Sequence, residues 1–149
     1  MSAETDTYIQ VLDALRQEIA ETIDGMNAGA LDWVPPAADT NSVAALVAHT
    51  AGAESFWIHQ VVGGIDVGRD RDAEFATTGR SSADLQALLR KTGETTREVL
   101  NGDPDLDKVV VARPGEPPSS LRYSVIHMIE HMGQHLGHLG LTKQLYEAR

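Results

Sequence analysis

Four segments of the chain place apolar residues at intervals of three and four, the period of an amphipathic helix. The expected helices run from about Asp6 to Met26, from about Val43 to Val62, from a cap at Ser81 or Ser82 to about Leu100, and over residues 119–147. A cap at Asn41 or Ser42 precedes the second of them. Four amphipathic helices joined by loops of differing length predict an all-α four-helix bundle, with residues 1–149 forming one domain.

The connections between these helices differ in kind. Residues 31–36 end in two prolines and predict an extended linker, because proline disfavours helix in the residue before it. Residues 64–80 alternate Asp and Arg and predict a polar, solvent-exposed loop without a functional role. The run Val109–Val111 is β-prone and ends at Pro114-Gly115, which predicts either one arm of a short β-hairpin or an extended crossover before the last helix.

Four of the six histidines lie within twelve residues of the last expected helix: His127, His131, His135 and His138. Intervals of four, four and three place these side chains on one helical face. Neutral imidazole is a common metal ligand, so the stripe predicts a metal site, with a solvated or packed histidine face as the alternative. An ion would use only two adjacent members, because residues seven apart lie about 10.5 Å apart along the axis. The spacing alone leaves the pairs 127/131 and 131/135 equally open.

The other two histidines lie on the second expected helix. His49 follows the start of the helix by about one turn and lies on its mostly apolar side, so a buried ring bonded to a carbonyl or hydroxyl is the alternative to a ligand. His59 is offset from His49 by about 80° around the axis and cannot share an ion with it. We expect His59 to be peripheral. Metal sites in bundles lie between facing helices, where His49 would meet the stripe.

Composition narrows the range of functions. The formal net charge of −10, from 22 acidic and 12 basic residues, argues against binding to nucleic acid or to an anionic membrane. No apolar run approaches the roughly 18 residues of a membrane span, and the acidic N-terminus lacks the pattern of a signal peptide, which favours a cytoplasmic protein. The chain has no cysteine, so a catalytic thiol would have to come from a partner or cosubstrate.

Two of the histidine segments resemble a known family. The segment His131-Met-Gly-Gln-His135-Leu-Gly137 resembles the His-x3-His-x-Gly motif of the DinB-like superfamily of bacterial metal-binding four-helix bundles. The segment Ser42–His49 resembles the family segment that ends in its first metal histidine. Residues 127–130 and 135–138 are similar to the mycothiol-type transferases, a branch that often has glutamate at the position of His131. The resemblance covers nearly the whole chain in helix order.

This resemblance implies both a fold and a site. It implies a bundle with long crossover connections and a divalent ion, zinc or nickel, held by His49, His131 and His135, with His127 and His138 nearby but outside the ligand set. It further implies a homodimer that transfers a low-molecular-weight thiol to a small electrophile, or catalyses a related hydrolysis or isomerisation. The alternative is a metal- or ligand-binding stress-response module without turnover.

Such a site would have an open coordination position, because three protein ligands are typical of catalytic zinc. A thiol that binds there can be held as thiolate. Carboxylates often orient metal histidines through the second ring nitrogen, and Glu54 and Glu130 are candidates by proximity in sequence. Trp33 and Phe75 are expected to be exposed and to contribute to a dimer interface.

Overall fold

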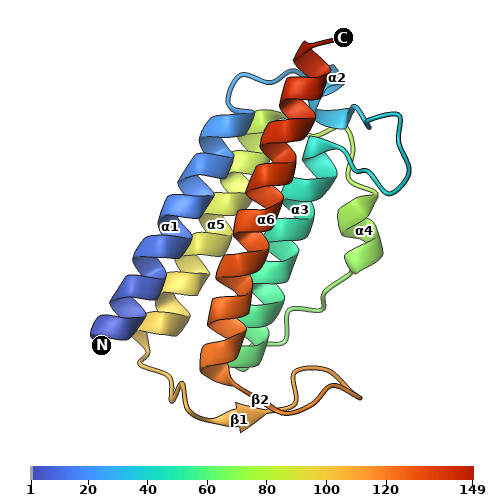
Figure 1. Ribbon diagram of the computed structural model, residues 1–149. Coiled ribbons are helices and arrows are strands. Elements are labelled where there is room, and N and C mark those ends of the chain that lie inside the picture. Colours follow the sequence, from blue (N-terminus) through green and yellow to red (C-terminus); the bar gives the residue numbers. More distant parts are fainter. Residues whose placement is uncertain (1) are drawn as a thin grey trace.

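The computed structural model describes residues 2–149 and consists mainly of four long helices (Figure 1). These are α1 (Ala3–Ile23), α3 (Val43–Glu54) with its π-helical continuation η1 (Ser55–Val62), α5 (Ser82–Asn101) and α6 (Leu121–Glu147). Helices α1 and α6 run in one direction and α3 and α5 in the other (Figure 1). Both α1 and α3 pack against α5 and α6. The predicted all-α bundle is confirmed.

A serine precedes each long helix and caps it. Ser2, Ser42, Ser81 and Ser120 each accept a hydrogen bond through the side chain from the backbone N–H three residues on. Such a cap satisfies one of the orphan donors of the first turn, so it selects where the helix begins. The structure thereby decides between the caps that the sequence left open, and it begins the first helix at Ala3 rather than near Asp6.

Helix α3 lies deepest in the bundle. Ten of its twelve residues are buried, because α5, α6 and the following connection surround it. Its apolar side chains join a core with residues of every long helix, such as Leu12, Ile58, Leu89 and Met128. The pattern predicted one helix over residues 43–62, whereas its last eight residues form the π-helix η1, which the amide of Gly63 continues by bonding to the carbonyl of Ile58. Apolar spacing carries no signal for this change of hydrogen-bond period.

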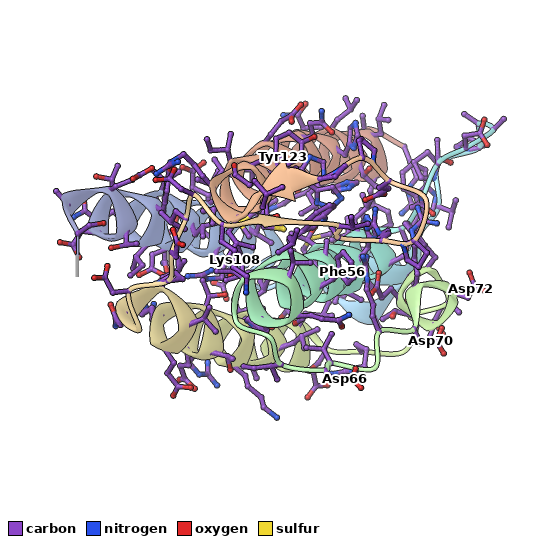
Figure 2. All side chains as sticks on the ribbon, turned by 90° about the horizontal axis from the view of Figure 1, so that it is seen from below. Phe56, Asp66, Asp70, Asp72, Lys108 and Tyr123 are labelled. Carbon is purple, nitrogen blue, oxygen red and sulfur yellow. The ribbon has the colours of Figure 1, made fainter. Side chains whose placement is uncertain are left out.

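The connection between α3 and α5 returns along the outside of the bundle, because these neighbouring helices run in the same direction (Figure 1). It contains a short helix, α4 (Arg71–Phe75), that packs on α3. The acidic side chains Asp66, Asp70 and Asp72 lie exposed on the outer side, as expected for a polar loop (Figure 2). The prediction of a loop is nevertheless wrong for residues 71–75, which form α4 and pack on α3.

Two smaller elements complete the chain. Residues Ala28–Asp32 form a helical turn, α2, where the sequence predicted an extended linker from Leu31 onwards. Asn27 caps this turn through its side chain, which explains the difference. The hairpin is confirmed: β1 (Val109–Val110) pairs antiparallel with β2 (Ser119–Ser120) just before α6.

A buried polar network crosses the core between α1, α3 and α5. Glu54 is fully buried; it pairs with Arg16 and accepts a hydrogen bond of 2.6 Å from the hydroxyl of Thr96. His59 is buried beside them, where its Nε2–H faces the carbonyl of Thr92 at 3.2 Å and lies 3.1 Å from the Thr96 hydroxyl. Glu54 therefore does not orient a histidine of the candidate site, in contrast to the prediction. His59 lies outside the histidine cluster, as predicted, and its ring is buried in the core.

The two aromatic residues expected at an exposed interface are half-buried. Trp33 packs edge-to-face on Tyr146, and the guanidinium of Arg149 lies 5.5 Å from its ring centroid. Phe75 stacks on His49. Both rings already pack against other side chains of the same chain, so they do not form the exposed dimer interface that the sequence suggested. The homodimer itself stays a prediction. Among residues 2–149, none of the helices is both long and apolar enough to span a bilayer.

Candidate metal centre

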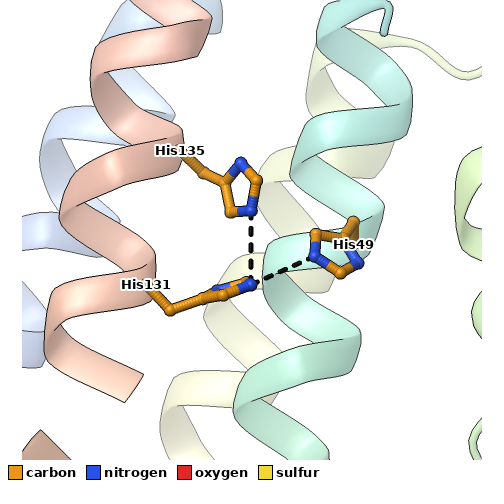
Figure 3. Close-up of side chains that lie close together, drawn as sticks. All are labelled: His49, His131 and His135. Carbon is orange, nitrogen blue, oxygen red and sulfur yellow. Dashed lines mark hydrogen bonds between the residues drawn. The ribbon is translucent and has the colours of Figure 1, made fainter. Parts of the chain in front are cut away.

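Three imidazole rings from two antiparallel helices meet between α3 and α6 (Figure 3). Nε2 of His131 lies 3.1 Å from Nε2 of His49 and 3.2 Å from Nε2 of His135. Each residue offers one ligand atom within 4.8 Å of the others, so these three side chains could hold one metal ion. The structure thus brings together the three histidines that the sequence singled out, and it favours the pair 131/135 over 127/131.

A carboxylate from the α3–α5 connection sets the orientation of His49. Oε2 of Glu74 lies 3.0 Å from Nδ1 of His49, on the side of the ring away from the other two histidines. Burial alone would raise the pKa of Glu74, but hydrogen bonds from Arg69 and His49 outweigh it and lower that pKa. An ionised carboxylate can only accept, so Nδ1 of His49 carries the proton and Nε2 presents its lone pair to the cluster.

Arg69 holds Glu74 from the other side. Its Nε and Nη2 donate to the two carboxylate oxygens at 2.7 and 2.9 Å. The pair is largely shielded, with side-chain exposures of 12% and 10%. A bidentate, partly buried pair of this kind fixes both the charge and the direction of the carboxylate. The chain Arg69–Glu74–His49 therefore ends at the nitrogen that faces the other two rings.

This approach of α4 to α3 requires a residue without a side chain at position 52. A Cβ on Gly52 would lie 1.9 Å from Oε1 of Glu74, far inside van der Waals contact. Phe75, next to Glu74, stacks on the ring of His49 with a centroid distance of 4.4 Å and an interplanar angle of 29°. The connection thus covers His49 with one carboxylate and one aromatic ring, and His49 is only 5% exposed.

The imidazole rings of His131 and His135 on α6 are in a protonation state suited to metal binding. Burial, together with the neighbouring imidazoles, lowers the pKa of His131 to about 3 and that of His135 to about 4. Both rings are therefore neutral near pH 7 and retain a lone pair. Nδ1 of His131 is buried and has no hydrogen-bond partner within residues 2–149, so no carboxylate matches it as Glu74 matches His49.

The donor set fits a divalent transition metal. Zinc bound tetrahedrally at 2.0–2.1 Å places ligand nitrogens about 3.4 Å apart, close to the two separations found here. Three neutral imidazoles suit zinc, nickel, copper or iron, whereas magnesium and calcium prefer oxygen ligands. Three protein ligands also leave a coordination position for an exogenous group.

The remaining histidines of the stripe flank the cluster without entering it. The ring of His127 packs edge-to-face on Trp57, and its centroid lies 6.2 Å from that of His131. His138 is exposed, with its Nδ1 at 3.4 Å from Nδ1 of His135, on the opposite side of that ring from Nε2. Both rings lie near the three-histidine group and are not part of it, and their place outside a ligand set stays a prediction.

Sequence reasoning missed the residues that support His49. Glu74 and Arg69 lie in the segment predicted to be an inert loop, while the two suggested carboxylates lie elsewhere: Glu54 in the core network and Glu130 exposed, 3.9 Å from His127. One signal was present. Gly52 interrupts an otherwise apolar helix three residues after His49, and a glycine inside a helix often marks close approach of another segment.

Comparisons with known proteins identify a family and agree with the fold. A protein-family model described as Mycothiol-S-transferase matches residues 7–148. No curated protein gives a significant match. The crystal structure of a conserved protein from Enterococcus faecalis is similar, with a TM-score of 0.79 and 19% sequence identity, and the match covers 100% of this chain and 99% of that chain. At this level of identity the likeness concerns the fold alone.

Proposed function

We propose that this chain, which belongs to the mycothiol-S-transferase family, is a metal-dependent transferase that joins a low-molecular-weight thiol to a small electrophile. His49, His131 and His135 are the proposed ligands of a divalent ion, zinc or nickel, and mycothiol is the thiol that the family description favours. The observation that carries the proposal is the convergence of three Nε2 atoms on one point between α3 and α6.

The absence of cysteine shapes the proposed chemistry. The protein has no sulfur nucleophile of its own, so the reacting sulfur must arrive on a cosubstrate. Bound to the three nitrogens, a divalent ion would act as a Lewis acid that lowers the pKa of a thiol and favours its thiolate. Overall, the thiol loses its proton to solvent, sulfur forms a bond to an electrophilic carbon, and the leaving group departs with its bonding electrons.

The protein's own residues prepare the site for this reaction. Glu74 keeps the proton of His49 on Nδ1, and Arg69 keeps Glu74 ionised and aimed at that ring. Phe75 covers the face of His49 and excludes water from it. The neutral state of His131 and His135 spares a bound ion from competition with protons near pH 7.

Two measurements test the proposal in sequence. Elemental analysis of protein purified without a histidine tag should find close to one divalent ion per chain in the wild type and none in His49→Ala, while His127→Ala serves as a control that retains the ion. Metal retained in full by His49→Ala would remove that residue from the ligand set.

The second measurement concerns turnover. Metal-loaded wild type should consume mycothiol in the presence of an alkyl or aryl halide, with glutathione and bacillithiol as comparison thiols. Treatment with a chelator should abolish this activity, and addition of zinc or nickel should restore it. Inactivity of the metal-loaded protein with every thiol and electrophile would instead support a metal-binding module without turnover.

A further inference from the structure

A cavity of about 310 Å³ lies between the loop before α3 and the C-terminal part of α6, and His138 of the histidine stripe lines it. The loop before α3 closes one side of it through Pro35, and α3 contributes Leu46. Helix α6 contributes Leu141 and Leu145. Volumes of 300–1,000 Å³ are usual for sites that bind small molecules, and this cavity lies at the small end of that range.

The cavity borders the histidine cluster on both helices. Leu46 precedes the proposed ligand His49 by three residues on α3 and so lies about one turn from it. Leu141 follows His138, which flanks the cluster, by three residues on α6. His138 lines the cavity and contacts His135 at the same time. Phe75 covers His49 from the side of α4, and Trp57 packs on His127 at the other end of the stripe. His138 is thus the residue that links the cavity to the candidate metal centre, and none of the three proposed ligands lines the cavity itself.

The residues that line the cavity determine which kind of ligand it favours. The lining contains no lysine or arginine, and its one carboxylate belongs to Asp39 at the exposed rim. An anionic group there would meet no lysine or arginine side chain of the lining. Leu46, Leu141 and Leu145 offer aliphatic surface, and burying it is favourable for an apolar ligand by about 25 cal/mol per Å².

We propose that this cavity binds the apolar body of a small, uncharged electrophile and so selects the second substrate of the transfer. The identification of the ligand as an electrophile rests on the proposed function. The preference for an uncharged, apolar ligand rests on the residues that line the cavity. Leu141 sets the size limit. Its side chain is 55% exposed, so position 141 can be enlarged with little risk to folding.

A binding experiment tests the preference without turnover. The probes are 2-naphthol, which is uncharged near pH 7, and the carboxylate 2-naphthoate, titrated into metal-loaded and metal-free full-length protein while the methyl NMR signals of leucine are followed. We expect 2-naphthol to shift Leu46, Leu141 and Leu145, and to bind more tightly than 2-naphthoate. Leu141→Phe should weaken the binding of 2-naphthol about tenfold or more, because the larger ring takes up ligand space.

The matched control is Ile126→Phe, which enlarges an exposed aliphatic residue on the same helix outside the cavity. It should change the affinity less than twofold. Tighter binding of 2-naphthoate, or equal binding by wild type and Leu141→Phe, would overturn the proposal. So would a change of oligomeric state in Leu141→Phe without a change in probe binding, because this face would then be an interface between two copies.

A kinetic experiment separates this inference from the proposed function. With benzyl chloride as electrophile, Leu141→Phe should raise the KM for the halide and leave the KM for mycothiol unchanged. An active transferase whose halide KM is insensitive to this substitution would refute the cavity assignment alone. A wild type that binds 2-naphthol as expected but transfers no thiol would refute the proposed function and leave the apolar binding site standing.

Discussion

Glu74 controls the candidate site through a single hydrogen bond to Nδ1 of His49. Carboxylates in this position fix the tautomer and the direction of a metal-binding imidazole and raise its basicity. The residue lies 25 positions away from His49, on a different element, and reaches it only because Gly52 has no side chain. At the scale of single residues, the orientation of His49 thus depends on Glu74 and Gly52, and no local sequence pattern connects these two positions.

Replacing Glu74 with glutamine tests this dependence. The amide keeps the size of the side chain but loses the charge that fixes the proton of His49 on Nδ1. We expect Glu74→Gln to weaken zinc affinity about 10- to 100-fold without loss of helical content, measured by competition with a chromophoric chelator. The control is Asp72→Asn, an exposed carboxylate on the same short helix, which should leave the affinity unchanged. Equal affinities of Glu74→Gln and wild type would show that His49 needs no such partner.

Gly52→Ala should weaken zinc affinity as Glu74→Gln does, because it disturbs the same contact between α3 and Glu74. The added Cβ lies 1.9 Å from Oε1 of Glu74, so the carboxylate has to move away from His49. Gly133→Ala is the matched control, because the Cβ at this position of α6 meets no atom within 4 Å. It should bind zinc like the wild type and gain up to about 1 kcal/mol of stability from helix propensity. Combining Gly52→Ala with Glu74→Gln should add little to either alone; additive losses would mean that the two residues act separately.

At the scale of elements, regular periodicity was the part of the fold that could be predicted. The four long helices, their serine caps and the short hairpin follow from apolar spacing and from capping residues, which are local properties. The π-helical end of the second helix and the short helix α4 could not be predicted, because both depend on contacts formed after the chain has folded. Helical spacing predicted the histidine stripe, whereas the choice of His49, His131 and His135 came from the family resemblance. Glu74 was missed because its partner lies on another element.

The buried network between α1, α3 and α5 should be a main determinant of stability. Burial raises the pKa of Glu54, against the opposing effects of Arg16 and Thr96, so its carboxylate depends on these partners. Arg16→Met leaves Glu54 without its cation and should lower the free energy of unfolding by about 3 kcal/mol. Urea denaturation of metal-free protein measures this change.

A second arginine provides the control for that experiment. Arg97 pairs with Asp13, as Arg16 also does, but its side chain is 44% exposed. Arg97→Met should therefore cost less than about 1 kcal/mol. The double substitution Arg16→Met with Glu54→Leu should recover much of the loss, because it removes the stranded charge along with its partner. A similar cost for Arg16→Met and Arg97→Met would contradict the central place of the network.

At the scale of the whole molecule, an ion held by His49 and the two α6 histidines would join the second and last long helices. Because the site exists only in the folded chain, free zinc at 100 times its dissociation constant should stabilise the protein by about 2.7 kcal/mol. For a chain of this size that corresponds to a rise in Tm of about 5–10 °C. Thermal melts of tag-free protein should show this rise in the wild type and in His127→Ala, and no rise in His131→Ala. A rise that survives in His131→Ala would place the stabilising ion elsewhere.

The same histidines should make the metal-free protein sensitive to mild acid. Burial lowers the pKa of His59, and burial with neighbouring rings lowers those of His131 and His135 to about 3 and about 4, from 6.5 in the unfolded chain. Above pH 6.5 these rings are neutral in both states and do not favour unfolding. As the pH falls below 6.5, the unfolded chain takes up protons that the folded chain does not, so the stability declines.

Each such group contributes a slope of up to about 1.4 kcal/mol per pH unit. Urea denaturation of metal-free protein between about pH 7.5 and about pH 5.5 covers the upper part of this window, before most carboxylates titrate. We expect the free energy of unfolding to fall towards pH 5.5 in the wild type, and to fall less in a variant with both His131→Gln and His135→Gln. The exposed His138→Gln serves as control and should follow the wild type. A free energy of unfolding that stays level over this range would mean that the rings of the site gain their protons as easily in the folded protein as in the unfolded chain.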